Sequence, residues 1–186
     1  MDRLFTIPNQ LTFLRIVLVP LFVTFVIYRM WGAALVTFVV AAATDALDGY
    51  LARRLNQRSY IGTLVDPLAD KVLMGSSYVL LAQKGLIPPW LAVLVLSRDV
   101  LIVGGVVLLK LFSSAELAIS PSLWGKLTTL FQVVTVVVVL CTKVFGCSIH
   151  YAYPLYLVTS LLTVVSGYLY FRQGWEAVNG GVDNGG

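Results

Sequence analysis

Four aspartates stand within 26 residues of an otherwise strongly apolar chain: Asp45, Asp48, Asp66 and Asp70. Residues three or four apart share one face of an α-helix, so Asp45 pairs with Asp48, and Asp66 pairs with Asp70. A carboxylate at the centre of a bilayer costs on the order of 2.5–3.5 kcal/mol, so such acids are rare and usually functional. Carboxylate oxygens are the ligands of hard cations such as Mg²⁺, Mn²⁺ and Ca²⁺. The spacing therefore predicts a site for a pair of divalent cations.

An antiparallel helix hairpin would bring the two aspartate pairs face to face. Asp45 and Asp70 would each lie eight residues from the connecting loop, which is about 12 Å below it at the usual helical rise. Asp48 and Asp66 would form a shallower tier of the same four-carboxylate cage. Because Mg²⁺ typically combines protein carboxylates with phosphate oxygens of a substrate, the expected ligand is a phosphoanhydride or phosphoryl group.

Three small residues lie among these acids: Gly49, Ala52 and Gly62. Without side-chain bulk at these positions, a nucleotide or pyrophosphate can lie against the backbone. The alternative is that they serve close helix packing, which is common in membranes. We favour the substrate contact for Gly49 and Ala52 because carboxylates flank them.

The amino-acid composition indicates which kind of secondary structure positions these groups. Of 186 residues, 59% are hydrophobic and only 12% are charged, with a mean hydropathy of +0.89. A hydrocarbon core about 30 Å thick needs about 20 apolar residues per helix. We predict an all-α, polytopic membrane protein with six transmembrane helices in one bundle. The predicted spans are Leu11–Tyr28, Gly32–Arg54, Thr63–Gln83, Pro89–Leu109, Leu123–Thr142 and Tyr151–Tyr170.

The distribution of Lys and Arg among the loops predicts the orientation. With the N-terminus in the cytoplasm, seven basic residues fall at the inner boundary and three fall outside, and the acidic cluster opens to the cytoplasm. The net charge of +4 thus reflects topology and anionic lipid, and no nucleic-acid partner is expected. The inner residues are Arg3, Arg53, Arg54, Arg58, Lys110, Lys126 and Arg172, and the outer ones are Arg29, Lys84 and Lys143.

The bundle is expected to form one domain, residues 1–178, followed by a disordered Gly- and Asn-rich tail, residues 179–186. No signal peptide or Arg- and Ser-rich leader is recognised, which favours a bacterial inner membrane. Cys141 and Cys147 flank the outer end of the fifth span, where a disulfide is possible, although two unpaired residues are favoured.

The acidic stretch resembles a known signature. Its pattern is similar at every fixed position to that of the CDP-alcohol phosphatidyltransferases, and four further segments resemble the phosphatidylglycerophosphate synthase and cardiolipin synthase branches. The signature is Asp45-x2-Asp48-Gly49-x2-Ala52-Arg53-x8-Gly62-x3-Asp66-x3-Asp70. The other segments are Ile7-Pro8-Asn9-Gln10-Leu11-Thr12, Asp66-Pro67-Leu68-Ala69-Asp70-Lys71, Ser97-Arg98-Asp99 and Gly125-Lys126-Leu127-Thr128-Thr129.

This resemblance implies an activity and roles for residues. It implies transfer of a phosphatidyl group from CDP-diacylglycerol to an alcohol, with release of CMP, at a cytoplasm-facing site of a frequently homodimeric membrane enzyme. Two Mg²⁺ or Mn²⁺ ions are the implied cofactors, and Ca²⁺ is expected to bind without activating. Asp45, Asp48, Asp66 and Asp70 are the implied ligands, and Asp70 is also the implied catalytic base. Gly49, Ala52, Arg53 and Gly62 would frame the cytidine diphosphate, and Asn9 is expected at the same site.

The acceptor alcohol is expected to meet basic residues outside the signature. Arg98 lies about ten residues into the fourth span, a costly depth without a partner. A guanidinium can bind a phosphate bidentately, so we favour a contact with the acceptor over an ion pair of Arg98 with Asp99 or another aspartate. Lys126 and Arg58 could complete the pocket, although Lys126 is almost equally well explained by topology. Arg15 and Lys71 are other internal basic residues, which could counter the acidic cluster.

Two acceptors are plausible, and we favour phosphatidylglycerol, which would give cardiolipin. The phosphatidylglycerophosphate synthases that this chain resembles tend to have a second Leu-Arg in the fourth helix, and that Arg is missing here. Residues 56–59 and 97–100 look closer to cardiolipin synthases of the eukaryotic type. The alternative is glycerol 3-phosphate, whose phosphate carries about two charges at neutral pH and needs more cationic groups. Another alcohol, such as inositol phosphate or serine, is the least favoured.

Other classes of protein fit less well. A small ion- or proton-coupled transporter would favour acids scattered over several spans or inverted repeats, and neither pattern is present. A purely structural membrane protein would have no reason to keep four carboxylates on facing helices. Either class predicts that replacing Asp70 by Asn leaves lipid products unchanged.

Overall fold

The computed structural model describes the backbone of residues 7–55, 60–112 and 123–180, and the side chains of residues 14–44, 71–105 and 123–173. These residues form six α-helices and one 3-10 helix, without a strand. The all-α prediction is therefore confirmed for the described part of the chain. The elements are α1 (Ile7–Ile27), α2 (Trp31–Leu55), α3 (Tyr60–Gln83), α4 (Pro89–Phe112), α5 (Leu123–Val144), η1 (Ile149–Ala152) and α6 (Tyr153–Gly180).

Each predicted span corresponds to one of these helices, and most helices are a few residues longer than predicted. Pro89 opens α4, as expected of a residue that lacks an N–H and fixes a helical φ. The end of α6 reaches Gly180, two residues into the predicted tail, and residues 181–186 lie outside the described part. Cys141 and Cys147 are both free, as favoured from the sequence.

Three helices end in the same way. After α1, α3 and α5, one residue takes a positive φ: Arg29 (59°), Gly85 (68°) and Gly146 (67°). The next N–H then donates to a carbonyl five residues back, as in the bonds from Leu86 to Leu81 and from Met30 to Phe25, both 2.8 Å. This Schellman arrangement satisfies carbonyls that the helix leaves open, and glycine adopts it without strain. The sequence thereby builds three tight turns.

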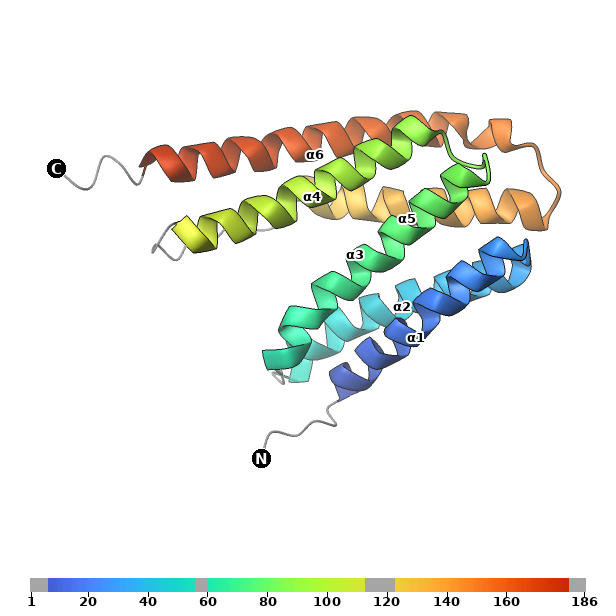
Figure 1. Cartoon of the computed structure of the whole chain (residues 1–186), viewed down its shortest axis with the longest axis horizontal. Helices are drawn as coiled ribbons and strands as arrows, with labels where there is room; N and C mark the ends of the chain where they lie inside the picture. Colours follow the sequence, from blue (N-terminus) through green and yellow to red (C-terminus); the bar gives the residue numbers. More distant parts are fainter. Residues whose placement is uncertain (1–6, 56–59, 113–122, 181–186) are drawn as a thin grey trace.

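The helices run alternately up and down, so the three tight turns gather at one end of the molecule (Figure 1). The starts of α1, α3 and α5 and the ends of α2, α4 and α6 lie at the other end (Figure 1). Helix α1 packs against α2 and α3, and α6 packs against α4 and α5. Helix α2 also contacts α5, and α3 contacts α4. Helices α1–α3 and α4–α6 thus form two groups joined through α2–α5 and α3–α4.

The interior holds many polar side chains. Buried Thr and Ser hydroxyls donate to carbonyls of their own helices, as Ser77 does to Leu73 (2.7 Å). Others join helices, since Thr135 on α5 and Thr159 on α6 share a hydrogen bond of 2.8 Å. Such side chains are the usual polar contacts between helices in membranes. Around them lie apolar residues, and the largest fully buried ones are Tyr78, Phe22, Phe38, Leu73, Leu81, Ile87, Leu91 and Leu140.

The exterior is apolar along the lengths of the helices. Val100 on α4 is 69% exposed and Leu161 on α6 is 64% exposed, with similar residues on the other helices. Large exposed apolar surfaces are rare on monomeric soluble proteins. Two stretches, Leu123–Val144 and Ile149–Gln173, are long and apolar enough to cross a membrane by length and composition, among the residues described. The six-span arrangement stays a prediction.

We expect Tyr156→Phe to lower the free energy of unfolding by about 1 kcal/mol. The buried Tyr156 hydroxyl donates to the Leu86 carbonyl at 2.7 Å, which ties α6 to the turn after α3. Thermal unfolding in detergent measures the loss. Tyr151→Phe is the matched control, because that ring is 81% exposed and its replacement should leave the melting temperature unchanged. Equal melting temperatures for Tyr156→Phe and the wild type would contradict the assigned contact.

Candidate active site

The four signature aspartates lie on two consecutive helices. Asp45 and Asp48 are on the second half of α2, and Asp66 and Asp70 are on the first half of α3. The backbone is helical at all four positions, so the predicted spacing does place each pair on one helix face. Their side chains lie outside the described residues, and the carboxylate cage and its cations therefore stay predictions.

The other signature positions belong to the same end of the molecule. The two helix ends that the α2–α3 connection joins, and the start of α1, lie at the end opposite the tight turns (Figure 1). Arg58 falls within residues 56–59 of that connection, outside the described part of the chain. The remaining predicted positions have helical backbone and undescribed side chains: Asn9 on α1, Gly49, Ala52 and Arg53 on α2, and Gly62 on α3.

A buried charged cluster joins α3, α4 and α6. Asp99 on α4 accepts hydrogen bonds through Oδ1 from Lys71 Nζ on α3 (2.5 Å) and from Nη1 of its neighbour Arg98 (2.9 Å). The Arg98 Nη2 group donates to Ser166 Oγ on α6 at 2.9 Å. The Arg98 guanidinium also lies 5.8 Å from the centre of the Tyr170 ring, within the range of a cation–π contact. We call Lys71, Asp99, Arg98 and Ser166 the α3–α4–α6 cluster.

The cluster is well shielded from solvent. The side chain of Arg98 is 6% exposed, that of Asp99 11% and that of Lys71 28%. Two cations share one carboxylate, so the cluster carries a net positive charge. An ion pair in such surroundings attracts strongly but has lost its hydration, and removing one partner is costly. The cluster therefore holds its three helices together.

The structure contains the ion pair that the sequence offered as the alternative for Arg98. Both Nη groups of Arg98 are engaged, and its buried Nε has no hydrogen-bond partner. A contact between Arg98 and the acceptor stays a prediction. The partners on α6 were missed, although Ser166 and Tyr170 stand four residues apart and so share a helix face.

The other internal basic residues differ in their surroundings. Arg15 is fully buried on α1, the helix that packs against both α2 and α3. Lys71, expected to counter the acidic cluster, pairs with Asp99.

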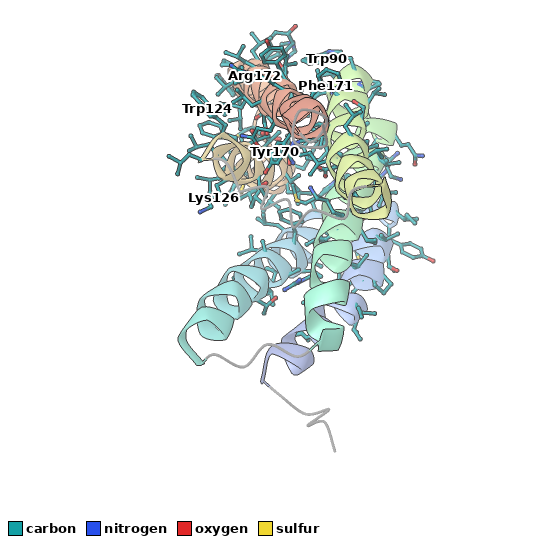
Figure 2. The ribbon with its side chains drawn as sticks, turned by 90° about the vertical axis from the view of Figure 1, so that its left-hand side faces the viewer. Trp90, Trp124, Lys126, Tyr170, Phe171 and Arg172 are labelled. Carbon is teal, nitrogen blue, oxygen red and sulfur yellow. The ribbon has the colours of Figure 1, made fainter. Side chains whose placement is uncertain are left out.

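Lys126 is exposed near the start of α5. Figure 2 shows it beside Trp124, at the end of the molecule where α6 finishes. On α6, Tyr170 lies on the inward side, whereas Phe171 and Arg172 are exposed (Figure 2). Lys126 is thus accessible at this end of the molecule, and its role in binding an acceptor stays a prediction.

Comparison with known proteins matches this chain over nearly its whole length. The sequence profile of the CDP-alcohol phosphatidyltransferase family matches residues 5–167. CDP-diacylglycerol–glycerol-3-phosphate 3-phosphatidyltransferase of Bacillus subtilis (strain 168) is 32% identical over 192 residues, covering 94% of this chain and 98% of the relative. The protein of the same name from Aquifex aeolicus (strain VF5) is 36% identical over 164 residues, covering 86% of each. Cardiolipin synthase (CMP-forming) of Homo sapiens is 35% identical over 193 residues, covering 93% of this chain and 63% of the relative.

Matches of this extent define the class of protein as an enzyme, a phosphatidyltransferase. The chain belongs to the CDP-alcohol phosphatidyltransferase family. The resemblance noted in the signature is thereby confirmed. Relatives of similar identity bear the names of both branches, so the comparison leaves the acceptor undecided.

We expect Arg98→Met to lower the free energy of unfolding by about 3 kcal/mol, because it leaves Asp99 buried with one cation fewer. Lys126→Met also replaces a basic residue by Met, but at an exposed position, and should lower the free energy of unfolding by less than about 0.5 kcal/mol. Chemical or thermal unfolding in one detergent compares the two variants. Equal losses of stability would contradict the structural role of Arg98.

Proposed function

We propose that this enzyme transfers the phosphatidyl group of CDP-diacylglycerol to an alcohol and releases CMP, at a divalent-cation site built by Asp45, Asp48, Asp66 and Asp70. The observation that carries the proposal is the placement of these acids. They stand at signature spacing on the adjoining halves of α2 and α3, within the stretch that matches the family.

The donor set suits two Mg²⁺ or Mn²⁺ ions. Four carboxylates from two consecutive helices offer hard oxygen ligands and leave coordination positions for phosphate oxygens. When bound, such a pair neutralises the pyrophosphate and stabilises the leaving phosphate. Ca²⁺ fits the same ligands, and we expect it to bind without activating.

The transfer itself is a displacement at phosphorus. The acceptor hydroxyl oxygen attacks the phosphorus that carries the diacylglycerol, and the bond from that phosphorus to the bridging oxygen breaks. The bridging oxygen leaves as part of the CMP phosphate, and the acceptor proton passes to the Asp70 carboxylate. Gly49, Ala52, Arg53, Gly62 and Asn9 would hold the cytidine diphosphate, so that the attack is in line.

A membrane location fits the distribution of side chains. The outer faces of the helices are apolar, and polar side chains are buried among the apolar ones of the interior. Aromatic side chains are exposed at both ends of the molecule, as in the belts of membrane proteins: Tyr28, Trp90, Phe145 and Tyr151 at the end with the tight turns, and Trp124, Tyr168 and Phe171 towards the other. We propose six spans in a bacterial inner membrane, with the acidic cluster facing the cytoplasm, and a homodimer.

For the acceptor, we propose phosphatidylglycerol, which would give cardiolipin. The fourth helix lacks the second Arg expected for a glycerol 3-phosphate site, and Asp99 and Ser166 already engage Arg98. Among the side chains of α4 that the structure describes, the one basic group, Arg98, is therefore already paired and not free to bind a dianionic phosphate through either Nη. The second candidate is glycerol 3-phosphate, favoured by near full-length coverage of the Bacillus subtilis relative named for that acceptor.

Asp70→Asn should lower metal-dependent CMP release at least about 100-fold, because it removes the base and a cation ligand together. The measurement is CMP release from CDP-diacylglycerol by purified protein in detergent with Mn²⁺. Asp183→Asn makes the same change outside the signature and should keep full activity. Chelation by EDTA should also abolish release. Full activity of Asp70→Asn would contradict the site, and an ion-coupled transporter would release no CMP from any variant.

Incubation of the enzyme with CDP-diacylglycerol and each acceptor separately identifies the product. We expect phosphatidylglycerol to be converted to cardiolipin, with little CMP released when glycerol 3-phosphate replaces it. Thin-layer chromatography of the labelled lipid reads the outcome. Phosphatidylglycerophosphate as the main product would overturn the preference for the lipid acceptor and leave the transferase proposal intact.

A further inference from the structure

We propose that Asp99 is a positioning residue for the acidic face of α3. By binding Lys71, it fixes the rotation of α3 at the turn that contains Asp70 and thereby sets the affinity of the site for its divalent cations. The inference rests on the proposed function, since it assigns to Asp66 and Asp70 the role of cation ligands.

Two described contacts on the face of α3 that meets α4 restrain this helix. Lys71 and Gly75 are four residues apart and therefore share a face. Lys71 bonds to Asp99, and at Gly75 an added Cβ would lie 3.3 Å from Leu96 Cδ2 of α4. One contact is ionic and the other is a close steric approach. Together they fix both the distance and the rotation of α3 against α4.

The acidic positions of α3 follow from that rotation. Asp70 directly precedes Lys71, which places it about 100° around the helix axis. Asp66 is one turn earlier, on the same face as Asp70. If Asp99 released Lys71, α3 could rotate about the contact at Gly75, and the acidic positions would shift relative to Asp45 and Asp48 on α2.

Helix α4 is itself restrained from the other side. Asp99 also binds Arg98, whose Nη2 donates to Ser166 on α6. The stem of Arg98 lies along α6, where an added Cβ on Gly167 would be 3.7 Å from Arg98 Cγ. The carboxylate of Asp99 thus receives a cation from α3 and one anchored on α6. The contacts of Arg98 with Gly167 and with the Tyr170 ring remain without the Ser166 hydroxyl, so the Lys71–Asp99 pair is the part of this support that acts on α3.

The test separates positioning from stability. Full-length Asp99→Asn, Lys71→Gln and Lys71→Arg are purified in detergent, with Ser166→Ala as the control that cuts the bond to α6 and leaves the Lys71–Asp99 pair intact. Three quantities are measured for each: the melting temperature, the dissociation constant for Mn²⁺ from titration calorimetry without substrate, and CMP release as a function of Mn²⁺ concentration.

We expect Asp99→Asn and Lys71→Gln to weaken Mn²⁺ binding about tenfold, the lower end of the range for groups that orient metal ligands from outside. Lys71→Arg should restore most of the affinity, because it keeps the ion pair. Ser166→Ala should lower the melting temperature and leave Mn²⁺ affinity unchanged. Wild-type affinity in folded Asp99→Asn or Lys71→Gln would overturn the inference, as would an equal loss of affinity in Ser166→Ala.

The proposed function can fail separately. A wild-type protein that binds Mn²⁺ and releases no CMP with any acceptor would refute the transferase proposal, while the Mn²⁺ affinities of the variants would still decide the role of Asp99. A wild-type protein that binds no Mn²⁺ would overturn both.

Discussion

The cost of charge inside an apolar bundle governs this structure. Arg98 and Lys71 are removed from most of the solvent, and both are bound by the single carboxylate of Asp99. A buried ion is retained only with a counter-charge and hydrogen bonds, and here the pairing also decides which helices touch. The four signature aspartates of α2 and α3 need a counter-charge for the same reason, and we propose that bound divalent cations supply it. Charge pairing thus links the packing of α3, α4 and α6 to the chemistry proposed for α2 and α3.

The two ends of the molecule differ in structure. Schellman turns close α1, α3 and α5 at one end. The end of α2 and the start of α3, which carry the signature, lie at the opposite end (Figure 1). Between the ends, Thr and Ser hydroxyls form hydrogen bonds with backbone carbonyls and with one another, as Thr135 does with Thr159. An interior of this kind can accommodate polar groups while the outer faces stay apolar.

Much of this could be predicted from the sequence, because local signals determine it. Apolar runs located the six helices, and Pro89 marked the start of α4. The signature spacing placed the aspartates on α2 and α3, and its resemblance gave the family. The partners of Asp99 were harder to predict, since Lys71 lies 28 residues away along the chain and Arg98 reaches Ser166 across 68 residues. Contacts between helices distant in sequence depend on packing, which periodicity alone does not specify. The acceptor was harder to predict for a similar reason, because its choice depends on which basic side chains are already paired within the protein.

We propose that the four aspartates form one site for two cations, and electron paramagnetic resonance of the protein with bound Mn²⁺ detects such a pair. Two ions in a shared site lie about 3.5–4 Å apart, so we expect a spin-coupled spectrum with two Mn²⁺ per chain, which is lost when Asp45 is replaced by Asn. An uncoupled six-line spectrum of single ions, or binding that survives this replacement, would show that the four aspartates do not form a shared two-cation site.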